Sequence, residues 1–101
     1  MRESETLDLA AEWSKLFKVL SDQTRLKLLL AMHYRGPGVA TVSELALAAG
    51  VTLPTASAAL VLMAEAGVIE PRRSGRTVNY ALRDARIHDL LHHVGGGHEH
   101  D

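Results

Sequence analysis

The sequence predicts a mainly helical α+β domain, in which four helices precede a β-hairpin and a fifth helix follows it. Three observations lead to this prediction. Apolar residues recur at helical spacing over most of residues 6–66 and again over residues 87–94. Between them, over residues 68–82, the spacing changes to an alternation of polar and apolar residues, which is typical of strands. Glycines and prolines stand at the joints. The expected order is therefore α-α-α-α-β-β-α.

Length and composition indicate one globular domain with a thin core. The chain has 101 residues, of which 47% are hydrophobic and 23% charged. Association with a second copy would bury more apolar surface. Cysteine is absent, which excludes disulfides and thiolate metal sites. Charged residues interrupt the apolar N-terminal segment, so we expect neither a signal peptide nor a membrane span, and a cytoplasmic location.

The first two helices are expected on either side of Ser21-Asp22, which offers an N-cap. Residues 6–20 carry apolar side chains at helical spacing, and residues 26–32 continue as a second, more apolar helix. Gly36-Pro37-Gly38 then ends the second helix.

Two shorter helices follow. The first is expected over Ser43–Ala49, with Ser43 as its N-cap and Gly50 in the left-handed position that ends it. The second is expected over Pro54–Ala66, because proline suits the first turn of a helix.

The hairpin and the last helix complete the domain. Residues 68–73 and 76–82 are expected to form strands joined by a tight turn at Ser74-Gly75, and Pro71 favours an edge position. Asp84 is expected to cap the last helix. Residues 1–94 would then be the domain, and residues 95–101 a flexible Gly/His-rich tail.

Two short helices joined by a glycine-containing turn are typical of a helix-turn-helix, and a hairpin after them is typical of the wing of a winged helix-turn-helix. The second helix would enter the major groove of double-stranded DNA with its first residues toward the bases, and the arginines of the hairpin would meet phosphate or the minor groove. The net charge of −1 conceals this basic segment. The candidate DNA-binding residues are Thr52, Pro54, Thr55, Ser57, Ala58, Arg72, Arg73, Arg76 and Thr77.

Other interpretations of these residues stay open. Thr52 and Thr55 also suit helix caps, and the arginines also suit an ordinary solvated face. No basic residue lies between Val51 and Arg72, which is unusual for a DNA-reading helix. A winged helix that binds another protein instead of DNA is therefore an alternative.

Histidines gather near the C-terminus. Five of the six lie in the last fourteen residues, among carboxylates. Nitrogen and oxygen donors without sulfur favour zinc, and also suit nickel or cobalt. The candidate metal ligands are Asp84, His88, His92, His98 and His100, of which the first three form a stripe along the border of one helix face. A loose metal-binding tail and a pH switch are alternatives. His33 is interpreted as an ordinary residue at a helix end.

Several separated motifs resemble the ArsR–SmtB family of metal-responsive repressors. They are Phe17-Lys18-Val19-Leu20-Ser21-Asp22-Gln23-Thr24-Arg25-Leu26-Lys27-Leu28-Leu29, Ser43-Glu44-Leu45-Ala46, Glu65-Ala66-Gly67-Val68-Ile69, and Gly75-Arg76 followed by Tyr80-Ala81-Leu82. The resemblance implies a homodimer through the first and last helices, an operator with two-fold symmetry, and release of DNA when an inducer binds. The candidate interface residues are Trp13, Phe17, Ile87, Leu90, Leu91 and Val94.

The chain departs from the family's metal-site patterns. Asp84 and His100 match two positions of the family's last-helix zinc site, but Arg86 and Gly97 stand at the other two. Thr41 and Ser43 stand where other members carry Cys-x-Cys. We therefore expect a rearranged site. The sequence also lacks a phosphate loop and a Gly-x-Ser-x-Gly elbow, so an enzyme is not expected. The leading hypothesis is a repressor released from its operator by zinc, nickel or cobalt. The alternative within DNA binding is a regulator controlled by pH, a small ligand or its own abundance.

Overall fold

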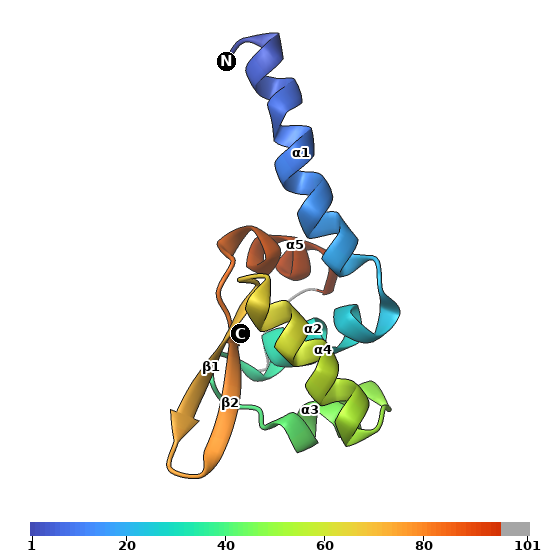
Figure 1. Ribbon diagram of the computed structural model, residues 1–101, viewed down its shortest axis with the longest axis vertical. Coiled ribbons are helices and arrows are strands. Elements are labelled where there is room, and N and C mark those ends of the chain that lie inside the picture. Colours follow the sequence, from blue (N-terminus) through green and yellow to red (C-terminus); the bar gives the residue numbers. More distant parts are fainter. Residues whose placement is uncertain (96–101) are drawn as a thin grey trace.

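A computed structural model describes residues 1–95 and confirms the predicted element order (Figure 1). The elements are α1 (Glu3–Leu20), α2 (Gln23–Arg35), α3 (Val42–Ala49), α4 (Leu53–Glu65), β1 (Ile69–Ser74), β2 (Thr77–Leu82) and α5 (Ala85–Gly95). Of the tail expected at residues 95–101, Gly95 is the last residue of α5, and the rest, including His98 and His100, lies outside the described residues.

Helix α2 lies at the centre of the core. It contacts the other four helices and also β2. Leu28 and Leu29 of α2 are completely buried, and Leu45 of α3 and Leu60 of α4 pack into the same cluster. Removing each such side chain from water contributes about 1.5–3 kcal/mol. Helix α2 is therefore the central element against which the other helices and β2 pack.

The helix starts follow from local side-chain caps, with one correction to the sequence prediction. Asp22 accepts a hydrogen bond from the Arg25 amide at 2.9 Å and so begins α2, as predicted. The N-cap of α3 is Thr41 instead of Ser43. Thr41 Oγ1 accepts from the Glu44 amide, and Glu44 Oε1 accepts from the Thr41 amide at 3.0 Å. This reciprocal pair needs a glutamate three residues after the cap, a condition that Thr41 meets and Ser43 does not.

The hairpin is a two-stranded antiparallel sheet, so both of its strands are edges. Pro71 lies opposite Tyr80 and is tolerated there, as expected for an edge proline. Ser74 pairs with Thr77, so the turn residues are Gly75 and Arg76, one position later than predicted. Gly75 has a φ of +62°, a left-handed conformation that favours glycine. Burial is confined to the base of the hairpin, which therefore projects outward from the core.

Helix α1 extends away from the rest of the molecule (Figure 1). Leu16 is its one buried residue, whereas Leu7 and Phe17 are 65% and 54% exposed. Much of the apolar face predicted for α1 therefore has no partner within the described subunit. No single helix of residues 1–95 is both long and apolar enough to cross a membrane, and α3 and α4, which meet those criteria only as a pair, are bent by 109°.

Candidate nucleic-acid interface and histidine cluster

Helices α3 and α4 cross at 109° and are joined by a turn of three residues. Gly50 ends α3 with a φ of +69°, the left-handed conformation that the sequence predicted. The Thr52 hydroxyl then begins α4 by accepting from the Thr55 amide, and Pro54 occupies the first turn. The angle and the turn are those of a helix-turn-helix.

The start of α4 is open to solvent. Thr52, Pro54, Thr55, Ser57 and Ala58 are all exposed. The Thr52 hydroxyl donates to the Thr55 hydroxyl at 2.9 Å, so these two side chains form one small unit at the helix start. Thr52 therefore fills the capping role that the sequence left open. Hydroxyls and methyls at this position are able to contact base edges, although no charged side chain accompanies them.

The hairpin tip carries the exposed cations. Arg73, Arg76 and Thr77 are exposed near the turn. Arg72 is exposed too, but it also lies against Gly38 and contacts Glu70 at 3.3 Å. In Figure 1, the start of α4 and the hairpin tip both lie at the lower end of the molecule, opposite the N-terminus of α1. One end of the molecule thus presents both candidate DNA-binding elements.

Arg25, a basic residue in the first turn of α2, has a structural role. Its Nε donates to the Val19 carbonyl at 2.9 Å, and its Nη2 donates to the Lys18 carbonyl at 3.2 Å. These contacts satisfy carbonyls at the end of α1 and place a cation where the helix dipole is negative. Lys15, Lys18 and Lys27 stay exposed.

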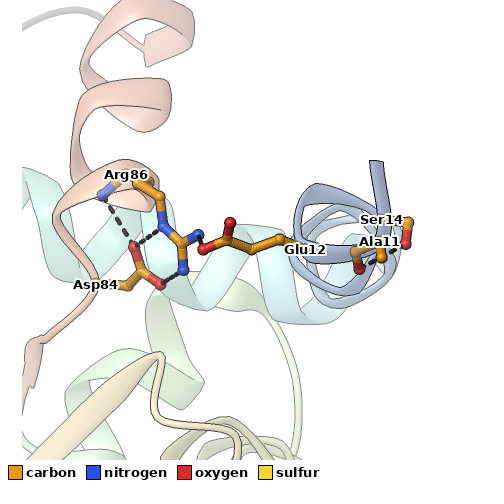
Figure 2. A network of polar contacts seen from close by, with 5 residues as sticks. All are labelled: Ala11, Glu12, Ser14, Asp84 and Arg86. Carbon is orange, nitrogen blue, oxygen red and sulfur yellow. Dashed lines mark hydrogen bonds and ion pairs between the residues drawn. The ribbon is translucent and has the colours of Figure 1, made fainter. Parts of the chain in front are cut away.

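Arg86 ties the start of α5 to α1 (Figure 2). Its guanidinium contacts both carboxylate oxygens of Asp84 and donates to Glu12 Oε1 at 2.6 Å. It also lies 5.6 Å from the centre of the Trp13 ring. The Asp84 carboxylate caps α5 as predicted, by accepting from the Arg86 amide at 2.9 Å. Hydrogen bonding to the Arg86 side chain lowers the pKa of Asp84 despite its partial burial.

Three histidines from two helices lie together at the junction of α2 and α5. The ring centres are 5.0 Å apart for His33 and His88, 5.7 Å for His33 and His92, and 6.2 Å for His88 and His92. His33 is only 4% exposed, while His92 faces solvent. Two hollows adjoin the cluster. One of about 130 Å³ is lined by His33 and His88, and an open one of about 410 Å³ by His88 and His92.

The predicted metal ligands are therefore only partly brought together. His88 and His92 share the cluster, whereas Asp84 belongs to the Arg86 ion pair. Within residues 1–95, no three histidine, aspartate or glutamate side chains are already arranged around a metal position. His33 was missed as a partner of the other two. Its place four residues after Leu29, on the buried face of α2, indicates burial of His33 but not which helix covers it.

The predicted interface residues separate into two groups. Ile87 and Leu91 are completely buried in the core of the subunit and present no surface to a second copy in this conformation. Trp13 and Leu90 are partly exposed, and Phe17 and Val94 are largely exposed. These four form the revised candidate interface.

Two curated bacterial repressors are similar to the chain in sequence, while no protein-family model matches it. The probable mercury resistance operon repressor of Streptomyces lividans is 33% identical over 78 residues, which are 77% of this chain and 60% of that protein. The biofilm growth-associated repressor of Xylella fastidiosa strain Temecula1 is 33% identical over 82 residues, which are 81% of this chain and 69% of that protein. The chain thus spans less than two thirds of the first relative.

Solved structures share the fold. The repressor BigR from Xylella fastidiosa has 30% identity, a TM-score of 0.81 and coverage of 93% of each chain. A homodimeric winged helix-turn-helix DNA-binding domain from Mycobacterium bovis, described as a possible ArsR-family transcriptional regulator, has 26% identity and a TM-score of 0.70, covering 93% of this chain and 84% of that one. These relatives are regulators of transcription, in agreement with the expectation that the chain is not an enzyme. From sequence and fold together, the chain belongs to the ArsR–SmtB family of winged helix-turn-helix transcriptional repressors.

Proposed function

We propose that this chain is a cytoplasmic, homodimeric DNA-binding repressor, which a transition-metal ion releases from its operator. Zinc is the first candidate for the metal, followed by nickel or cobalt. The observation that carries the DNA-binding part is the shared position of two exposed elements. The start of α4 and the arginine-bearing hairpin tip occupy the same end of the molecule.

Each element supplies a different part of DNA binding. Thr55 and Ser57 at the start of α4 offer hydroxyls to base edges, and Ala58 allows a close approach of the backbone. Arg73 and Arg76 supply the positive charge that α4 lacks, and such contacts with phosphate dominate affinity. The hairpin is therefore the main electrostatic contact in this proposal.

The homodimer places two such ends on one operator. The apolar side chains of α1 that remain exposed, Leu7 and Phe17 among them, support this assembly. The Mycobacterium bovis neighbour is a homodimer, which also supports it. A symmetric dimer reads a DNA site with two-fold symmetry.

The proposal of a metal effector rests on the kinds of ligand atoms that the chain offers. The similar Streptomyces repressor is named for mercury resistance. This chain has no cysteine, so its metal would be bound by nitrogen and oxygen donors, which zinc, nickel and cobalt accept. The ligands proposed from the sequence are Asp84, His88, His92, His98 and His100. The imidazoles of His88 and His92 fit this role, whereas Asp84 would first have to leave Arg86.

The test begins with selection of a bound sequence from random duplex DNA. Fluorescence anisotropy with that duplex then measures the Kd of metal-free protein, for which about 10⁻⁸ M or tighter is expected at physiological salt. Addition of Zn²⁺, Ni²⁺ or Co²⁺ should weaken binding by about 5–150-fold, the usual range of such coupling, and a chelator should restore it. Mg²⁺, which prefers oxygen ligands, is the matched control.

Two results would contradict the proposal at different points. No duplex binding even at low salt would overturn DNA binding and favour a winged helix that binds another protein. Tight, sequence-selective binding that none of the three metals changes would leave the repressor and overturn the metal effector.

A further inference from the structure

The arrangement of three imidazoles from α2 and α5 points to a ligand set that differs from the one proposed from the sequence. The rings of His33, His88 and His92 lie within 5.0–6.2 Å of one another, centre to centre. With Zn–N bonds of about 2.0–2.1 Å, three imidazoles on one tetrahedral ion have ring centres about 5 Å apart. The ring centres are therefore within about 1 Å of the separation that a shared ion requires, and the ring nitrogens would also have to turn toward one point.

The two helices allow this contraction. His88 and His92 are four residues apart on α5, the spacing at which two histidines on one helix face bind a single metal ion. Both side chains reach solvent, whereas His33 is buried, so the contraction requires a change of rotamer at His88 and His92. The open hollow beside His88 and His92 leaves room for the ion to enter and for water or a further ligand.

The surroundings also suit a bound cation. Asp89 Oδ1 lies 3.5 Å from Nδ1 of His88, so Nε2 is the nitrogen of that ring assigned to the metal. Arg86 lies two residues before His88 in the sequence. Its positive charge is compensated by ion pairs with Asp84 and Glu12. The negative charge of the Asp84 carboxylate is compensated by the same ion pair with Arg86.

We infer that His33, His88 and His92 form a three-histidine site for a divalent transition-metal ion within one subunit, at the junction of α2 and α5. Asp84 is not a ligand of this site. The inference rests on the proposed function for the class of metal. It adds His33 to the ligands proposed from the sequence and removes Asp84, His98 and His100. It also makes the site independent of the partner subunit.

The position of the site links it to the hairpin. The smaller hollow beside His33 and His88 is also lined by Gly36 and Pro37, which follow α2. The next residue, Gly38, accepts a hydrogen bond from Asn79 Nδ2 of β2 at 2.7 Å. The histidine cluster therefore adjoins the loop that contacts the middle of the hairpin, and contraction of the cluster is expected to be transmitted to β2 through this loop.

The experiment measures metal binding without DNA. Co²⁺ and Zn²⁺ are titrated into the full-length chain, with visible absorption of Co²⁺ and calorimetry of Zn²⁺ as readouts. His33→Gln, His88→Ala and His92→Ala should each lower metal affinity at least about 100-fold, because even loss of a group that only orients a ligand costs 10–100-fold. His93→Ala, Asp84→Asn and the double variant His98→Ala with His100→Ala are the controls and should retain affinity within about 3-fold.

Folding of the variants is checked by circular dichroism before titration. His33 is buried, so His33→Gln is paired with His33→Asn, and the surface variant His92→Ala keeps the test decisive if both fail to fold. Unchanged affinity in His92→Ala, or in a folded His33 variant, overturns the site. Loss of binding in Asp84→Asn or in the tail double variant also overturns it, in favour of the ligands proposed from the sequence. A site that loads as expected while DNA affinity stays constant supports this inference and contradicts only the proposed metal effector.

Discussion

Arg86 holds the Asp84 carboxylate with two guanidinium contacts, since Nε lies 3.1 Å from Oδ1 and Nη2 lies 2.8 Å from Oδ2. A carboxylate engaged in this way has no oxygen left without a donor, although its place in the sequence matches a metal ligand of the family. Asp84 is therefore part of an ion-pair network that links α5 to α1, because Arg86 also contacts Glu12 of α1 (Figure 2).

Asp84→Asn tests this role. Asparagine still caps α5, so only the ion pair is removed, and a partly exposed pair of this kind contributes at most about 1 kcal/mol. Asp84→Ala removes the cap as well and should cost about 1 kcal/mol more. Thermal unfolding measures both, with the exposed Asp89→Asn as control. Equal stability of the asparagine and alanine variants would contradict the capping role.

The capping box of α3 predicts a pH dependence. The pKa of Glu44 is lowered, first by the hydrogen bond from the Thr41 amide, then by the Thr41 hydroxyl and by Arg35. A carboxyl with a lowered folded-state pKa stabilises the fold above its unfolded pKa, and this contribution is lost as the pH falls through the folded value. Chemical unfolding of the wild type between pH 6 and about pH 3 should therefore lose more stability than Glu44→Gln, which does not titrate there. Parallel curves for the two proteins would contradict the assignment.

The sequence predicted the element order because each boundary has a local signal. Asp22, Gly50 and Pro54 act within a few residues of their own positions. Where two signals competed, as at the start of α3, the pair of Thr41 and Glu44 decided the outcome. Such signals are properties of short segments and are visible in a single sequence.

The site was less predictable because it depends on which helix faces meet. Helical spacing placed Ile87 and Leu91 on one apolar face of α5, but it could not show that this face packs against the core of the same subunit. For the same reason the sequence does not show which residues lie beside His33. Its proximity to His88 results from the packing of α5 on α2 and has no signature in either segment.

The hairpin cations predict the salt dependence of DNA binding. Arg73→Ala and Arg76→Ala each remove one exposed cation and should lower affinity for all duplex sequences alike. Each should also reduce the slope of log K against log salt by about 0.9 for every phosphate that the variant no longer neutralises. Arg2→Ala, next to α1 at the opposite end of the molecule, is the matched control and should leave the slope unchanged. A slope that responds to Arg2 and not to Arg73 would move the DNA surface away from the hairpin.

The uncharged start of α4 predicts a gain of affinity on addition of charge. Ala58 is exposed in the first turns of α4, where no basic residue occurs. Ala58→Lys should increase affinity for random duplex DNA and steepen the salt slope by the amount expected for about one additional neutralised phosphate. The control Ala11→Lys places the same charge on an exposed position of α1, which extends away from the start of α4 (Figure 1). An equal gain in both variants would indicate a general effect of net charge.

The unpartnered face of α1 predicts the oligomeric state. Phe17 is 54% exposed and lies 5.7 Å from the Trp13 ring, so a second copy would bury two equivalent Phe17 side chains. Burial of the exposed half of each contributes about 0.8–1.6 kcal/mol, and two glutamate charges at the interface cost more, so Phe17→Glu should raise the Kd of the dimer by about 100-fold or more. Sedimentation equilibrium distinguishes the dimer from the 11.0 kDa subunit. Leu47→Glu, an exposed apolar position on α3, is the control and should remain dimeric. If Leu47→Glu dissociates the dimer and Phe17→Glu does not, the interface lies on α3 and the apolar face of α1 has another occupant.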